Sequence, residues 1–194
     1  MKTVFFDVDT QIDFLYPAGA LYVPGAETIV DRVAALNRYA AEHGIVVVSD
    51  MDAHAEDDPE FKTWPPHCVV GTTGQTKIAP TLLDKRIVVP NEPCEVNLEG
   101  VQQVLLEKQT LDCFDGVNLT KLMEKAAAER YVVYGVVTEI CVKCAAWGLL
   151  KTRKRIELVT DAVRSLDERA AKQMMAEFTA SGGMRTTAAE VTGV

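Results

Sequence analysis

Short apolar runs alternate along this chain with longer segments whose apolar residues recur at helical spacing. The short runs are rich in β-branched residues and predict strands at 4–9, 45–50, 86–90, 101–108, 131–137 and 155–160. The longer segments predict helices at 27–42, at 118–130, from residue 141 onward and from about 165 to 180. Residues 186–192 are a candidate for a last edge strand.

Local signals define several ends of these helices. Gly44 ends the first helix, and Asn118 is expected to cap the second. Ser165 and Glu168 have the spacing of a capping box that opens the last helix, with Gly182 beyond its end. The segment 51–85, rich in Pro, Gly, Thr and Asp, is expected to be a loop too long to be a simple connection.

The alternation of strands and helices predicts a parallel sheet with helices on both faces. Ligands of such sheets bind beyond the carboxyl ends of the strands. Asp9, Asp52, Lys108 and Cys141 each follow an apolar run closely. We therefore expect residues more than a hundred positions apart to meet at one edge of the sheet.

Composition narrows the class of protein. The chain has 194 residues, 48% hydrophobic and 25% charged, which predicts one globular domain over 1–194. The formal net charge of −8 argues against nucleic acid or an anionic membrane as partner. No apolar run is long enough to span a membrane, and Met1 to Asp7 do not have the pattern of a signal peptide. An odd number of cysteines, five, at irregular spacing indicates reduced thiols and a cytoplasmic location.

Cys141 is the candidate nucleophile, because it stands where an apolar strand turns directly into a helix. The free N–H groups and the dipole of that helix are expected to favour its thiolate and to hold an oxyanion. A hydrolytic cysteine also needs a base and a positive group, which Asp9 and Lys108 can supply. Taken singly, Asp9 could be a turn former, Lys108 a solvated strand end and Cys141 a buried apolar residue.

A second group of residues has the spacing of a metal site. Asp52 and His54 are two positions apart, His67 follows about a dozen residues later, and Glu60 lies between them. This set suits Zn²⁺ or a similar divalent ion. The alternative is a surface loop with incidental polar residues. His43, the third histidine, ends a helix and is expected to be a surface residue.

Cys141 and Cys144 also form a C-x-x-C pair, so a thiol redox protein is an alternative interpretation. The pair lacks the aromatic residue before it and the Gly-Pro within it that a thioredoxin-like motif has. The pattern assigns no role to Cys68, Cys94 or Cys113.

Three segments in order resemble the isochorismatase-like cysteine hydrolases. They are Asp9-Thr-Gln-Ile-Asp-Phe14, Lys108 with the later Phe114-Asp-Gly116, and Gly135-Val-Val-Thr-Glu-Ile-Cys-Val142. The resemblance covers most of the chain and implies a Rossmann-like three-layer α/β/α fold with a mainly parallel six-stranded sheet. It also implies a homo-oligomer and a catalytic triad of Asp9, Lys108 and Cys141.

The resemblance further implies a cis peptide between Val136 and Val137, which would aim the Val137 and Cys141 N–H groups at the oxyanion. The pattern D-x-H with W-P-x-H-C, formed by Asp52, His54, Trp64, His67 and Cys68, resembles the nicotinamidase branch.

Membership of that branch implies a divalent metal, zinc or else iron or manganese, that holds the ring nitrogen of a small carboxamide. Its ligands would be Asp52, His54, Glu60 and His67. Phe14 and Trp64 match the aromatic residues that enclose the ring. The implied activity is hydrolysis of nicotinamide to nicotinate and ammonia.

Three departures from the branch affect this expectation. Glu60 stands where many nicotinamidases have a third metal histidine, and Glu139 replaces the usual aspartate. The segment 111–113 lacks the tyrosine common there. A related amidase acting on pyrazinamide, ureido compounds or maleamate therefore stays an alternative, as does a non-catalytic metal-binding or regulatory domain.

Overall fold

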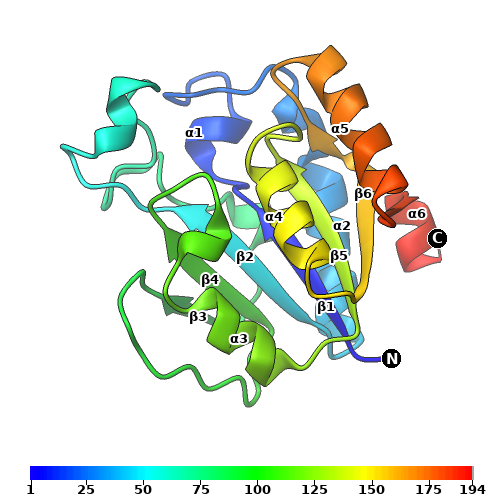
Figure 1. The fold of residues 1–194 in the computed structure, drawn as a ribbon. Helices are drawn as coiled ribbons and strands as arrows, with labels where there is room; N and C mark the ends of the chain where they lie inside the picture. Colours follow the sequence, from blue (N-terminus) through cyan, green and yellow to red (C-terminus); the bar gives the residue numbers. More distant parts are fainter. Residues whose placement is uncertain (194) are drawn as a thin grey trace.

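The computed structural model describes residues 1–193 and has a central parallel sheet of seven strands in the order β3-β4-β2-β1-β5-β6-β7 (Figure 1). The strands are β1 (Thr3–Val8), β2 (Val46–Asp52), β3 (Arg86–Val89), β4 (Gln103–Lys108), β5 (Arg130–Val136), β6 (Arg155–Arg164) and β7 (Met184–Thr186). The α-helices are α1 (Ile12–Leu15), α2 (Val30–Glu42), α3 (Leu119–Ala126), α4 (Cys141–Leu150), α5 (Glu168–Ala180) and α6 (Ala188–Thr192). Short 3-10 helices are η1 (Ala26–Ile29), η2 (Pro59–Lys62), η3 (Ala79–Thr81) and η4 (Cys113–Asp115).

The helices form a layer on each face of the sheet, which confirms the predicted α/β/α class. Alternate residues of β1 separate the two cores: Phe6 packs with residues of α3, α4 and α5, whereas Phe5 packs with residues of α1, α2 and α6. Figure 1 shows α3 and α4 in front of the sheet and α2 behind it. The two longest α-helices, α2 and α5, have 13 residues each, so no described helix reaches the length and apolarity of a membrane span.

The sheet has one strand more than the six expected, and the prediction of an edge strand over 186–192 was wrong. The edge strand β7 is short and ends at Thr186. The Thr187 side chain then accepts a hydrogen bond from the Glu190 N–H, and the Glu190 carboxylate accepts one from the Thr187 N–H. This capping box starts α6 and so ends the extended segment.

Two predicted helix ends were also wrong. Asp167, not Ser165, is the N-cap of α5, and its carboxylate accepts from the N–H groups of Arg169 and Ala170. Helix α3 ends at Ala126 rather than near residue 130, because Ala127 takes a left-handed conformation. Asn118 does precede α3, but its side chain makes no cap bond and donates to two loop carbonyls instead.

Gly135 lies where β5 passes closest to β1. Its φ is +120°, and an added Cβ would lie 2.0 Å from the Val8 carbonyl oxygen. We expect Gly135→Ala to lower the free energy of unfolding by about 4 kcal/mol, because the clash is with backbone. Gly44→Ala is the matched control: its φ is +65° with no atom within 4 Å of the added Cβ. This control substitution should lower the free energy of unfolding by only about 1 kcal/mol. Urea denaturation of both variants measures this, and equal losses would contradict the close approach.

Candidate active site

Four neighbouring strands bring the predicted catalytic residues to one edge of the sheet. Lys108 ends β4, Asp52 ends β2, Asp9 follows β1, and Cys141 begins α4 just after β5. These strands adjoin in the order β4-β2-β1-β5, and Asp52 pairs directly with Lys108. The carboxyl ends of parallel strands lie at the same edge, so the expected meeting of distant segments follows from strand order.

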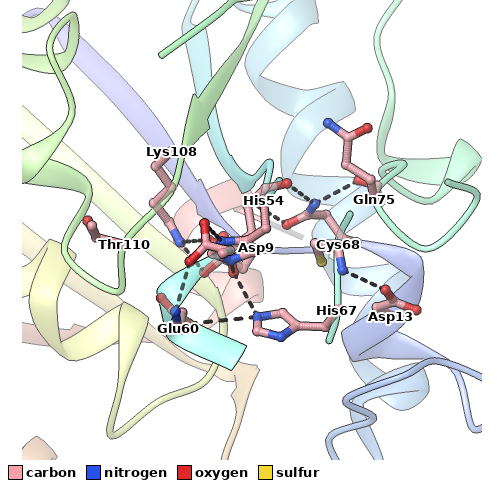
Figure 2. A network of polar contacts seen from close by, with 12 residues as sticks. Asp9, Asp13, His54, Glu60, His67, Cys68, Gln75, Lys108 and Thr110 are labelled. Carbon is pink, nitrogen blue, oxygen red and sulfur yellow. Dashed lines mark hydrogen bonds and ion pairs between the residues drawn. The ribbon is translucent and has the colours of Figure 1, made fainter. Parts of the chain in front are cut away.

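Lys108 is the buried cation between two carboxylates. Its Nζ lies 3.0 Å from Asp9 Oδ2 and forms an ion pair with Asp52 Oδ1 as well (Figure 2). Burial alone would lower the pKa of Lys108, but attraction from Asp52 and Asp9 raises it well above its usual value. Burial alone would raise the pKa of Asp52, yet Lys108 and the two neighbouring histidines bring it below its usual range. Lys108 and Asp52 both favour their charged forms, whereas the pKa of Asp9 is shifted the other way.

Asp9 has the properties of a general base. Burial is the largest cause that raises its pKa, with the Asp52 charge adding to it, and the pKa reaches about 6 although Lys108 opposes the shift. A base with a pKa near neutral is well matched to proton transfer. Asp9 lies close enough to Cys141 that each changes the pKa of the other: Asp9 raises that of the thiol, and the thiol lowers that of Asp9.

The expectation of a resting thiolate was wrong. Burial of Cys141, which is 6% exposed, raises the pKa of its thiol well above the usual value, and Asp9 adds to the effect. Lys108 opposes the rise without reversing it. The resting pair is therefore a Cys141 thiol beside an Asp9 carboxylate, so the nucleophile must be formed by proton transfer during the reaction.

A tight turn joins the end of β5 to the start of α4, where the oxyanion is expected. The peptide between Val136 and Val137 is cis, as the resemblance implied. The Val137 carbonyl accepts from Ile140 and Val142, which curls the chain into the start of α4. The N–H groups of Val137 and Cys141 flank this turn, one just after the end of β5 and the other at the first residue of α4. They are the donors available to a developing negative oxygen.

Asp52, His54 and His67 form a compact buried cluster. One ligand atom from each lies within 4.8 Å of the others. Asp52 Oδ2 is 3.7 Å from His54 Nε2 and 3.6 Å from His67 Nε2. The opposite ring nitrogens are already engaged: His54 Nδ1 lies 3.0 Å from Asp58 Oδ2, and His67 Nδ1 lies 2.8 Å from the Pro65 carbonyl. Such bonds at Nδ1 leave Nε2 as the ring nitrogen that can ligate a metal ion, which would displace its proton.

The donor set fits a divalent ion. His54 Nε2 and Glu60 Oε1 are buried without a hydrogen-bond partner among the described residues. Glu60 lies outside the cluster of three, but its Oε1 is 3.8 Å from His67 Nε2 (Figure 2). Burial alone would lower the pKa of His54, yet the neighbouring Asp52 and Asp58 carboxylates raise it to about 9. The cluster therefore favours positive charge, which a metal ion would supply. The role of Glu60 as a fourth ligand stays a prediction.

A pocket beside this cluster contains the predicted nucleophile and the predicted aromatic residues. Phe14, Trp64 and Cys141 line it together with Asp52, Glu60 and His67. The Phe14 ring centroid lies 5.4 Å from that of His67. The remaining lining is aliphatic and consists of Leu21, Val23, Leu111, Val137, Ile140 and Leu166. Polar groups are thus concentrated on one side of an otherwise apolar pocket.

Sequence reasoning missed two supporting residues of the metal cluster. Asp58 orients His54, and its only sequence signal is its position four residues later in the same loop. Gln11 lies within the motif that carries the resemblance, but no role was assigned to it. Its amide oxygen accepts from the Asp52 N–H at 2.8 Å, and its amide nitrogen donates to the Asp52 carbonyl at 2.8 Å. This reciprocal pair fixes the backbone of Asp52.

Comparison with known proteins places this fold and site. A family model described as the isochorismatase domain matches residues 3–190, and the chain belongs to this family. Relatives with a named activity are amidohydrolases, namely nicotinamidases and a streptothricin hydrolase.

An uncharacterised isochorismatase-family protein of Bacillus subtilis is 29% identical, over 94% of this chain and 97% of its own. A nicotinamidase of Saccharomyces cerevisiae is 23% identical, over 87% of this chain and 90% of its own. The structure of a pyrazinamidase of Pyrococcus horikoshii in complex with zinc has a TM-score of 0.83 and 26% identity, over 96% of this chain and 99% of that one.

Proposed function

We propose that this protein is a metal-dependent nicotinamidase that hydrolyses nicotinamide to nicotinate and ammonia. One observation carries the proposal: Asp9, Lys108 and Cys141 gather beside the buried Asp52–His54–His67 cluster, and a single pocket reaches both Cys141 and that cluster. A flat ring between Phe14 and Trp64 would place a carboxamide near the sulfur and a ring nitrogen near the cluster. A zinc-bound relative and a nicotinamidase relative support the same assignment.

The reaction follows from the proton positions. Asp9 accepts the thiol proton as the Cys141 sulfur attacks the carboxamide carbon, and the carbonyl oxygen becomes an oxyanion held by the Val137 and Cys141 N–H groups. Asp9 returns the proton to the nitrogen, the C–N bond breaks, and ammonia leaves a thioester on Cys141. Asp9 then takes a proton from water, whose oxygen attacks the thioester. The C–S bond breaks, Asp9 returns its proton to the Cys141 sulfur, and the acid leaves as nicotinate after losing its remaining proton to solvent.

The metal site has a positioning role in this proposal. Asp52, His54, His67 and Glu60 would hold the ion, for which zinc is proposed, and the bound ion would supply a Lewis acid that holds the ring nitrogen. Lys108 keeps Asp9 in place and balances its charge together with that of Asp52.

The pocket lining argues against some related substrates. A maleamate-type amide carries a carboxylate on an acyclic chain, and apart from the proposed metal ion no Lys or Arg among residues 1–193 lines this pocket to bind it. The charged residues that line this pocket are Asp52 and Glu60, with His67 beside them, and its other walls are apolar. An uncharged aromatic carboxamide matches this lining better, so nicotinamide and pyrazinamide are favoured over maleamate.

The direct test is ammonia release from nicotinamide, with metal content measured on the same sample. Pyrazinamide, benzamide and maleamate complete the panel. We expect turnover of nicotinamide and pyrazinamide, which have a ring nitrogen, to be far above that of benzamide and maleamate. Equal turnover of benzamide would show that the ring nitrogen is not held, and turnover of maleamate alone would replace the proposed substrate.

Activity should fall on the acid side of neutrality. Asp9 must be ionised to accept the thiol proton, and its pKa is raised to about 6. The kcat/KM should therefore decrease tenfold per pH unit below about pH 6 and level off above it. A pH series of ammonia release, with metal retention checked at each pH, measures this. A profile that stays flat to about pH 4.5 would show that a carboxylate with an ordinary pKa is the base.

A further inference from the structure

Leu166 is unusual among the exposed apolar residues of this protein. It is 43% exposed and stands in the connection between β6 and α5. Among the described residues, it is the one large exposed apolar side chain that also lines the pocket of Cys141. An exposed leucine needs no explanation by itself, but one at the edge of an apolar pocket adds apolar surface to whatever binds there.

Four hydrogen bonds connect the segment that carries Leu166 to the segment that precedes Cys141. The Glu139 Oε1 atom accepts from the Leu166 N–H at 2.8 Å and from the Asp167 N–H at 2.7 Å. The Arg164 carbonyl accepts from the Thr138 N–H and from Thr138 Oγ1, both at 2.8 Å. The loop is thus fixed on both sides of Leu166 to the turn that forms the oxyanion site.

Glu139 is the residue that fixes the backbone of Leu166 to the turn before Cys141. It lies two positions before Cys141 and receives both N–H groups on a single carboxylate oxygen. The Asp167 carboxylate meanwhile caps α5, so the loop cannot rotate without losing one set of bonds or the other. A charged acceptor makes such bonds stronger than a neutral one does.

We propose that Leu166 is a specificity-determining residue that limits which ring substituents the pocket accepts, and that Glu139 is the positioning residue that keeps it there. The inference rests on the proposed function and extends it from the carboxamide end of the substrate to its ring. The ligand class is an uncharged heteroaromatic carboxamide with an unsubstituted ring edge facing Leu166.

The test measures selectivity rather than activity alone. The probes are nicotinamide and the set of nicotinamides that carry one methyl group on the ring. Leu166→Ala should raise kcat/KM for at least one methylated amide, relative to nicotinamide, by about tenfold or more, because one methyl-sized contact is worth about that factor. Metal content and thermal stability should stay at the wild-type level, because Leu166 is exposed.

Met184→Ala is the matched control, because Met184 is 44% exposed on β7 and does not line the pocket. Its selectivity should equal that of wild type.

Glu139→Ala should raise the kcat/KM ratio of the same methylated amide to nicotinamide that Leu166→Ala raises. In the double variant this ratio should exceed that of either single variant by no more than about twofold. Glu139→Gln should restore the wild-type selectivity, because its amide oxygen can accept both N–H groups. A purely structural role of Glu139 would lower stability without moving this ratio.

Two outcomes would overturn the inference and can be told apart. A wild type that converts nicotinamide, with a Leu166→Ala variant of unchanged selectivity, would overturn the role of Leu166 alone. A metal-loaded wild type that releases no ammonia from nicotinamide would overturn the proposed function and this inference with it.

Discussion

Replacing Cys141 with alanine should reduce turnover of nicotinamide by about 10⁴-fold or more, the scale of loss when a covalent nucleophile is removed. The variant should still bind its metal, because Cys141 makes no contribution to the Asp52–His54–His67 cluster. Ammonia release and metal content, measured on one preparation, check both parts of this expectation.

Cys144→Ser is the matched control for this experiment. Cys144 lies on the same helix one turn later and does not line the pocket. A hydrolase that uses Cys141 alone should keep its turnover within about twofold in this variant, since most surface or neutral-site substitutions have small effects. A dithiol redox protein would lose its activity instead, so the same variant separates the two interpretations of the C-x-x-C pair. Wild-type turnover by Cys141→Ala would end the covalent mechanism.

Replacing His54 with alanine should remove the metal and raise KM strongly, by about a hundredfold or more, since even supporting residues of a metal site change affinity by 10–100-fold. The His54 Nε2 atom is one of three ligand atoms gathered within 4.8 Å, and it has no other partner among the described residues. Because Cys141 and Asp9 are untouched, kcat at saturating substrate should fall less than kcat/KM.

Asp58→Asn is a milder change at the same site, for comparison with His54→Ala. Asp58 contacts His54 Nδ1 at 3.0 Å and does not belong to the ligand cluster. Its substitution should lower metal affinity by about 10–100-fold, so that added metal restores activity. Metal titration of both variants distinguishes a lost ligand from a misoriented one. Full metal content in dialysed His54→Ala protein would show that this cluster is not the metal site.

The meeting of the candidate catalytic residues at one edge of the sheet was predictable because the alternation of strands and helices indicates a parallel sheet. Asp9, Lys108 and Cys141 each follow an apolar run, and parallel strands place their carboxyl ends together. The burial of that edge was not predictable, because it depends on side chains from loops that no periodic pattern describes. The error about the Cys141 thiolate has this origin: helix position alone favours ionisation, whereas burial reverses the direction of its pKa shift.

Contacts between loops were outside the reach of sequence patterns for a related reason. The bonds from Leu166 and Asp167 to Glu139 join positions 27 and 28 residues apart through one carboxylate rotamer. No local propensity encodes such a contact. The four-residue helix α1 was missed as well, because it is too short to show a helical period. The segment 186–192 was wrongly predicted as a strand, because the capping box of Thr187 and Glu190 starts a helix there instead.

The position of β1 in the sheet has a consequence for how the protein acquires its shape during synthesis. β1 leaves the ribosome before the other strands of this sheet, yet it lies between β2 and β5, and β5 does not begin until Arg130. One side of this apolar strand therefore stays open while more than a hundred further residues are added. During that interval the nascent chain exposes the unpaired backbone edge of β1, the kind of surface that molecular chaperones shield.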